Sequence, residues 1–85
     1  MIPKRPPARL SETTELWVAH PTAGDMLDLE ARGEKPGLML WYLVRFLVDS
    51  DGRPHLRTEE EARQVPAEVA NALVAKVGEL AAGRP

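Results

Sequence analysis

The chain has 85 residues, of which 44% are hydrophobic and 28% charged, and its formal net charge is -2. This length allows a single domain, and the near-balanced charge argues against a dedicated nucleic-acid-binding protein, which usually carries a basic excess. The absence of cysteine excludes disulfides, thiolate metal sites and cysteine nucleophiles. We therefore expect a small soluble protein of a reducing, cytoplasmic compartment.

The first ten residues, MIPKRPPARL, contain three prolines, Pro3, Pro6 and Pro7, together with three basic side chains. Proline fixes φ and removes a backbone donor, which excludes a helix interior or a central strand. The segment also lacks the apolar core of a signal peptide. The longest apolar run, residues 38–44, is far shorter than the roughly 20 residues of a transmembrane helix. We predict a flexible, Pro-rich basic arm over residues 1–10 and a single helical domain over residues 11–85.

The first regular element expected is a short strand within residues 13–19, TTELWVA, which is rich in β-branched and aromatic residues. Leu16 and Val18 fall on one face of this strand, and Trp17 falls on the other. A single strand leaves its backbone groups unpaired, so it must pair with another segment of this chain or with another chain. Few other segments resemble strands, and this scarcity favours a role in protein association.

A first helix is predicted over about residues 23–32. Thr22 can cap its N-terminus, with Asp25 completing a capping-box variant, and Gly33 suits the left-handed residue that ends a helix. Its apolar face consists of Met26, Leu27 and Leu29.

A second helix is predicted to begin near Pro36. Every residue from 38 to 48 is apolar or aromatic except Arg45. A helix that is apolar almost all round is normally buried on every side, and a chain of this size has few elements to surround it. Two interpretations stay open. Either another molecule covers part of this helix, or its neighbours wrap it and leave Trp41 and Tyr42 half exposed.

The remainder of the chain predicts a turn and two further helical segments. Asp51-Gly52 is a strong turn dipeptide, and Thr58 with Glu61 forms a second capping box that opens a short acidic helical turn. Pro66 starts the last helix, whose apolar stripe comprises Val69, Leu73, Val77 and Leu80. The expected fold is mostly α, a small helical domain of three to four helices with one short N-terminal β-strand.

No residue pattern predicts catalysis or metal binding. His20 and His55 each lie beside a proline, and their spacing matches no zinc pattern. No hydroxyl group stands in a nucleophile motif. The last helix lacks basic residues at its start, where a DNA recognition helix needs them. We expect no enzyme activity, no cofactor, no metal and no nucleic-acid partner.

The order of motifs resembles the small tail assembly chaperones of long-tailed bacteriophages, over about residues 13–82. The motifs that carry this resemblance are PT-x-x-D (Pro21, Thr22, Asp25), D-x-D-G-x-P (Asp49, Asp51, Gly52, Pro54), T-x-E-E (Thr58, Glu60, Glu61) and V-P-x-E-V-x-x-x-L-V from Val65. The first ten residues do not match the family.

This resemblance implies a non-enzymatic protein of the infected cell's cytoplasm. Such chaperones bind the tape measure protein and help recruit tail tube subunits. A helix that is apolar almost all round suits docking of an amphipathic partner helix, and an exposed strand suits pairing with another chain. We also expect a homo-oligomer. The alternative function is a small helical oligomerisation or adaptor module, such as a virion connector or an antitoxin-like partner protein.

The predicted partner surface centres on Trp41 and Tyr42, because large aromatic side chains dominate protein interfaces. Neighbouring residues on a helix point about 100° apart, so both rings cannot face the same small core. The alternative is that Trp41 only covers the edge of the core. The full predicted set is Trp17, Leu38, Trp41, Tyr42, Arg45 and Phe46.

Overall fold

Helices and a small sheet make up the protein, which a computed structural model describes over residues 6–11, 14–33 and 37–83. The described part is about half helical, with four helices and one three-stranded antiparallel sheet. The elements in chain order are β1 (Ala8–Arg9), β2 (Trp17–Val18), α1 (Ala23–Arg32), α2 (Leu38–Phe46), β3 (Leu47–Val48), α3 (Glu59–Ala62) and α4 (Ala67–Ala81). No helix in these described ranges is long and apolar enough to cross a bilayer.

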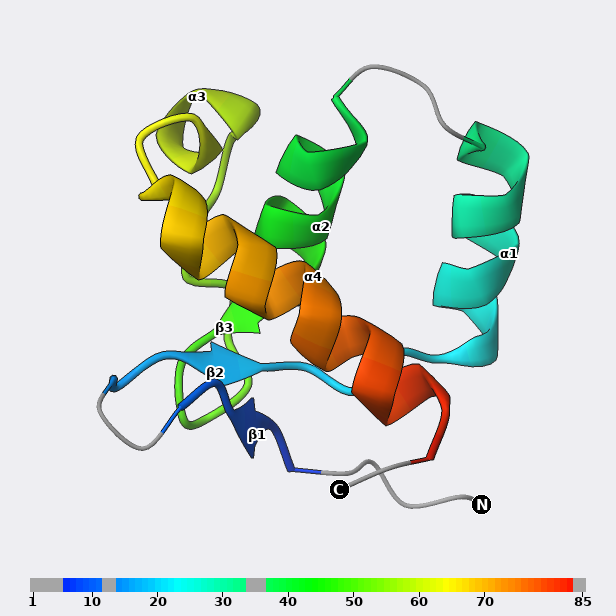
Figure 1. The fold of residues 1–85 in the computed structure, drawn as a ribbon, viewed down its shortest axis with the longest axis horizontal. Coiled ribbons are helices and arrows are strands. Elements are labelled where there is room, and N and C mark those ends of the chain that lie inside the picture. The colour runs from blue at the N-terminus through cyan, green and yellow to red at the C-terminus, as the bar shows by residue number, and fades with distance from the viewer. Residues whose placement is uncertain (1–5, 12–13, 34–36, 84–85) are drawn as a thin grey trace.

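The hydrophobic core lies where α2, α4 and β2 meet. Figure 1 shows α4 crossing in front of α2, with α3 at one end, the sheet below and α1 set apart on the far side. The predicted stripe on the last helix is largely buried here, and Leu73 has no exposed surface. The core cluster consists of Val18, Leu43, Phe46, Leu47, Leu56, Ala62, Ala70, Leu73, Val77 and Leu80.

The sheet corrects the expectation of a mostly α fold with one strand. Strand β2 is central, pairing with β1 on one side and with β3 on the other. The predicted strand therefore pairs its backbone groups with two other segments of the same chain. Each strand has only two residues, too few for an alternating pattern to appear in the sequence.

The last part of the basic arm predicted over residues 1–10 belongs to the sheet. Residues 1–5 lie outside the described ranges, but Ala8–Arg9 form edge strand β1, and the Leu10 N–H donates to the Leu16 carbonyl at 2.9 Å. Prolines are tolerated at the start of an edge strand, so Pro6 and Pro7 do not prevent the pairing.

The second helix ends two residues earlier than its apolar run predicts. Leu47 adopts an extended backbone, with φ -79° and ψ 112°, because it pairs with Val18 in the sheet. The Ala19 N–H donates to the carbonyl of Phe46, the last residue of α2, at 2.9 Å. Sheet pairing thus overrides the helical pattern at this end of α2.

The predicted caps form largely as expected. The first helix has the predicted bounds, and Thr22 and Asp25 make both hydrogen bonds of the capping box. Thr58 caps α3 by accepting from the Glu61 N–H at 3.2 Å. In a complete capping box the Glu61 carboxylate would accept from the Thr58 N–H. It accepts instead from the Arg57 N–H at 3.0 Å, so only one of the two hydrogen bonds of the predicted second box forms.

Candidate protein-binding surface on helices α1 and α2

Four of the predicted partner residues form one stripe along α2. Leu38, Trp41, Tyr42 and Arg45 recur at spacings of three, one and three, which places them on the same side of a helix. Leu38, Trp41 and Tyr42 are half-buried and Arg45 is exposed, whereas Leu43 on the opposite side of the helix and Phe46, one turn after Tyr42, are buried in the core. We call these four residues the α2 stripe.

The two aromatic rings of the α2 stripe are fixed by the core beneath them. The ring of Trp41 meets Tyr42 edge-on at 5.4 Å between centroids, and it meets Phe46 at 5.6 Å with perpendicular planes. Tyr42 also lies against Phe46 at 5.8 Å. Edge-to-face contacts of this kind are favourable beyond the area they bury. Buried Phe46 therefore holds both half-exposed rings in place.

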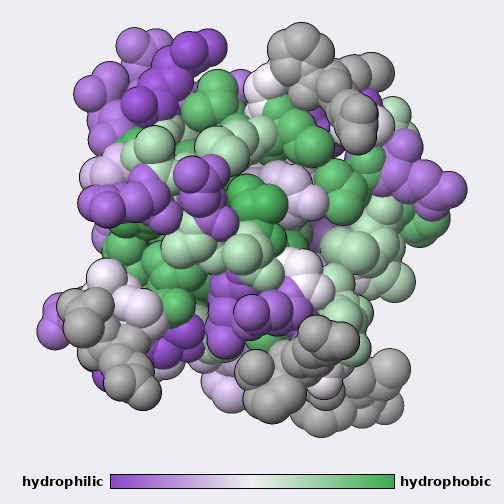
Figure 2. Space-filling view, viewed as in Figure 1, coloured by the Kyte–Doolittle hydropathy of each residue, from purple (hydrophilic) through white to green (hydrophobic). Residues whose placement is uncertain are grey.

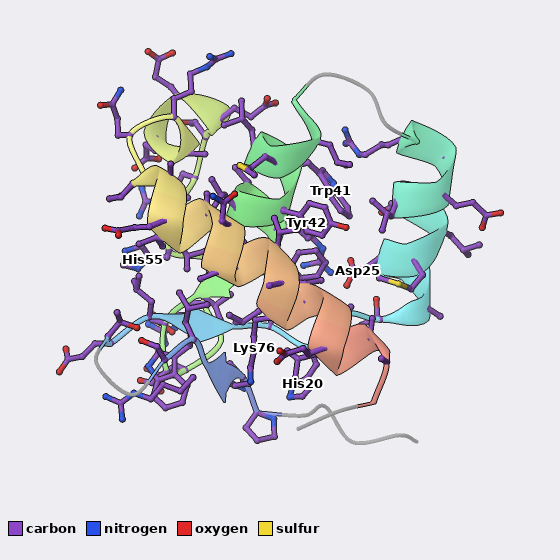
Figure 3. The ribbon with its side chains drawn as sticks, in the orientation of Figure 1. His20, Asp25, Trp41, Tyr42, His55 and Lys76 are labelled. Atoms are coloured by element: carbon purple, nitrogen blue, oxygen red, sulfur yellow. The ribbon has the colours of Figure 1, made fainter. Side chains whose placement is uncertain are left out.

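Helix α1 lies across from the α2 stripe. Figure 3 shows Trp41 and Tyr42 in the space between α2 and α1, with Asp25 on the side of α1 that faces α2. The guanidinium of Arg32 lies 5.2 Å from the centre of the Trp41 ring, a cation–π contact. The Arg45 Nε donates to Asp25 Oδ1 at 2.6 Å. These two polar contacts join the C-terminal and N-terminal turns of α1 to α2.

The apolar side chains of α1 do not belong to the core. Met26 and Leu29 are half-buried, Leu27 is 67% exposed, and none of the three is among the residues that form or pack against the core cluster. In Figure 2 the surface between α4 and α1 is mainly green and pale, while purple residues gather over α3 and at the upper part of α1. This arrangement leaves an apolar and aromatic surface between α1 and α2 that the chain covers only in part.

Asp25 is the buried polar centre of this surface, with only 3% of the residue exposed. Its Oδ1 accepts from Arg45, and its Oδ2 accepts from the Thr22 N–H at 2.9 Å. A buried carboxylate needs such partners to offset its loss of hydration. Since the Arg45 side chain is 49% exposed, the ion pair connects buried Asp25 with solvent.

The other two predicted partner residues lie elsewhere. Phe46 is fully buried, so it supports the α2 stripe from below and is not a surface contact in this structure. Trp17 stands on the central strand next to buried Val18, and since side chains alternate along a strand it faces away from the core. The Arg9 guanidinium lies 5.7 Å from the Trp17 ring centre. Trp17 thus belongs to a separate surface.

Sequence reasoning missed the part that α1 plays. Met26, Leu27 and Leu29 are predicted to form one apolar face, but Leu27 is 67% exposed, and it is Arg32 that reaches Trp41. Only long-range contacts place Asp25 against the second helix, and no local signal in the sequence encodes them.

The remaining polar residues are dispersed. His20 and His55 lie on different sides of the molecule (Figure 3). Within residues 6–11, 14–33 and 37–83, no three His, Asp or Glu side chains are grouped closely enough to hold a metal ion. The Asp49-Gly52 segment is a turn, as predicted, in which the Gly52 N–H donates to the Asp49 carbonyl at 3.0 Å.

Comparison with known proteins adds no relative. No family model matches the chain, and neither a curated protein nor a solved structure matches it.

Proposed function

We propose that this protein is a non-enzymatic tail assembly chaperone of a long-tailed bacteriophage. In the host cytoplasm it binds the tape measure protein and helps to recruit tail tube subunits. The observation that carries the proposal is the α2 stripe, in which Trp41 and Tyr42 are held half-exposed beside a helix that does not belong to the core. The order of motifs over residues 13–82 supports the choice of this family.

The α2 stripe has the features of a helix-docking surface. Its four residues, Leu38, Trp41, Tyr42 and Arg45, cover two helical turns, which matches the spacing of anchors on an amphipathic partner helix. Tryptophan, tyrosine and arginine are the residue types most enriched among binding hot spots. Because Phe46 fixes both rings, little side-chain entropy is lost when a partner covers them.

The residues that carry the family resemblance hold structural positions. Thr22 and Asp25 cap α1, and Asp49 with Gly52 forms the turn after β3. Thr58 caps α3. The motifs that carry the resemblance therefore shape the scaffold that holds the α2 stripe. A similar scaffold would present a similar helix-docking surface to the partner.

The test is co-expression with the tape measure protein encoded in the same genome, followed by size-exclusion chromatography. We expect a stable complex with the wild-type chain. Trp41→Ala and Tyr42→Ala should each weaken binding at least about tenfold, as hot-spot truncations do. Leu27→Ala, which removes a similar apolar side chain from the outer side of α1, serves as the matched control and should leave binding unchanged. Failure of the wild-type chain to form a complex would reject the proposal.

A small oligomerisation or adaptor module is the second candidate. Leu27 and Met39 are 67% and 42% exposed, and large apolar side chains in contact with water favour association with another surface. Light scattering at micromolar concentration, together with the co-expression test, distinguishes the two functions. A homo-oligomer that Leu27→Ser dissociates, together with no complex with the tape measure protein, would favour the adaptor.

A further inference from the structure

We infer that α1 is a movable cover of the α2 stripe, which lifts off Trp41 in the free protein while the rest of the fold stays intact. A partner then reaches the uncovered aromatic rings. This inference adds a control on access to the α2 stripe, and it rests on the proposed function only for the identity of the partner. It comes from the kind of contacts that hold α1 in place.

Helix α1 lies outside the packed body of the protein. Figure 1 shows it set apart from α3, α4 and the sheet. Within the described residues, none of the closely packed pairs of elements includes α1, whereas α2 packs against both α3 and α4. Met26 and Leu29 are half-buried, but neither belongs to the core cluster or packs against it. Lifting α1 therefore breaks no contact within the core cluster.

Two polar contacts hold α1 against α2, one at each end of α1. In the first turn Asp25 Oδ1 accepts from Arg45 Nε at 2.6 Å, and in the last turn the Arg32 guanidinium lies 5.2 Å from the centre of the Trp41 ring. Arg32 is exposed and the Arg45 side chain is 49% exposed, so water replaces part of each interaction when α1 lifts. Contacts of these two kinds together favour the closed position on the order of ten- to hundredfold, which leaves the open form at about 1–10%.

The caps of α1 are made by its own segment. Thr22 and Asp25 form both hydrogen bonds of the capping box. At the other end, the Gly33 N–H donates to the Leu29 carbonyl at 3.0 Å. Because these hydrogen bonds stay within residues 22–33, α1 moves as one unit without removing a cap or a backbone hydrogen bond from another helix or from the sheet.

The closed position of α1 occupies groups that a docked partner needs. Arg32 lies over the Trp41 ring, and Arg45 is bound to Asp25. A partner along the α2 stripe competes with both contacts, so its apparent affinity is reduced in proportion to the fraction of open molecules. A partner that contacts the uncovered rings together with α1 ends the motion of α1.

Hydrogen exchange of the free, full-length chain tests the motion. A ten-residue helix is marginal in water on its own, so the amides of α1 exchange when it lifts. We expect them to exchange together, at least about tenfold faster than the amides of α4.

A nearly isosteric substitution tests the contact that holds the cover closed. Asp25→Asn keeps an oxygen for the Thr22 N–H and turns an amide NH2 toward Arg45, so it breaks the ion pair and keeps the cap. It should accelerate exchange in α1 at least about fivefold and leave α4 unchanged. Glu79→Gln, which makes the same change in the Lys76–Glu79 ion pair on α4, is the matched control and should leave α1 unchanged.

Trp41 fluorescence tests whether the motion uncovers the α2 stripe. The chain has two tryptophans, so Trp17→Phe leaves Trp41 as the single fluorophore. In this background, Asp25→Asn should increase the collisional quenching of Trp41 by acrylamide, and Glu79→Gln should not.

Four results would overturn the inference: exchange of α1 at the rate of α4 in the wild-type chain, the same response of α1 to Asp25→Asn as to Glu79→Gln, faster exchange of α4 together with α1 in Asp25→Asn, or unchanged quenching of Trp41 in that variant. Binding of the tape measure protein separates this inference from the proposed function. If the wild-type chain binds that protein but α1 does not open in the free chain, the function stands and the inference fails. If α1 opens but no complex forms, the inference stands and the function fails.

Discussion

Replacing Asp25 with alanine removes the two interactions that fix the start of α1. Oδ1 accepts from Arg45 at 2.6 Å, and Oδ2 accepts from the Thr22 N–H at 2.9 Å as half of the capping box. The apolar side chains of α1 lie outside the core cluster, so few packing interactions hold α1 in place when these two hydrogen bonds of Asp25 are lost. We expect Asp25→Ala to destabilise the protein and to loosen α1 in particular.

The magnitude follows from the burial of each partner. A fully exposed ion pair contributes about 0.2–1 kcal/mol, whereas breaking a fully buried pair costs about 3–5 kcal/mol. Asp25 is buried but the Arg45 side chain is 49% exposed, and water solvates its guanidinium when the carboxylate is removed. We therefore assign about 1–2 kcal/mol to the pair. The lost capping bond adds about 1 kcal/mol, which gives a total of about 2–3 kcal/mol.

A double-mutant cycle with Asp25→Ala and Arg45→Met, followed by urea denaturation, measures the pair alone. The coupling free energy should be about 1–2 kcal/mol. Thr22→Ala is the control, because it removes the other capping bond, costs about 1 kcal/mol and leaves the ion pair intact. A coupling below about 0.3 kcal/mol lies within ordinary additivity and would refute the idea that the ion pair attaches α1.

Four further substitutions test the fold. Leu73→Ala should lower the free energy of unfolding by about 2–5 kcal/mol in urea denaturation, since Leu73 is fully buried, and a loss under about 0.5 kcal/mol would contradict the packing of α4. Gly78→Ala should stabilise α4 by about 0.5–1 kcal/mol because nothing lies within 4 Å of the added methyl. Gly33→Ala should cost about 1–3 kcal/mol because of its φ of 61° and ψ of -147°, and equal melting temperatures for the two glycine variants would oppose this assignment. Hydrogen bonding from the Arg53 N–H lowers the pKa of Asp49, so this carboxylate contributes stability above its ordinary pKa that is lost as pH falls through the lowered value. An NMR titration should give a lowered pKa for Asp49, and Asp49→Asn should remove this part of the acid dependence. An ordinary pKa would contradict the turn geometry.

Local signals predicted α1 in full. Thr22 and Asp25 form the capping box within four residues, and Gly33 ends the helix with a positive φ that non-glycine residues rarely adopt. Each of these signals depends only on neighbours in the sequence. The bounds of the helix therefore follow from the sequence alone.

Long-range pairing explains what the sequence did not predict. The two residues of β3 continue the apolar run of α2, and only their pairing with β2 turns Leu47 into an extended conformation. Ala8–Arg9 become a strand in the same way, by pairing with β2. Neither pairing has a local cue of its own, since two residues are too few for an alternating pattern.

The candidate site was predicted in part for a similar reason. Periodicity places Leu38, Trp41, Tyr42 and Arg45 on one side of a helix. It does not show which side the core takes, because residues 38–48 are apolar almost throughout. The packing of α4 and α3 against α2 decides this point, and it places Phe46 in the core.

Hydrogen–deuterium exchange of the complex with the tape measure protein tests the central claim most directly. Helix α2 is central to the core, so we expect its amides to exchange slowly even in the free protein. Helix α1 is therefore the sensitive reporter of a partner at the α1–α2 surface. We predict that the backbone amides of α1 gain the most protection when the complex forms. Protection confined to α3 or to the edge strand β1, with α1 unchanged, would contradict binding at the α1–α2 surface.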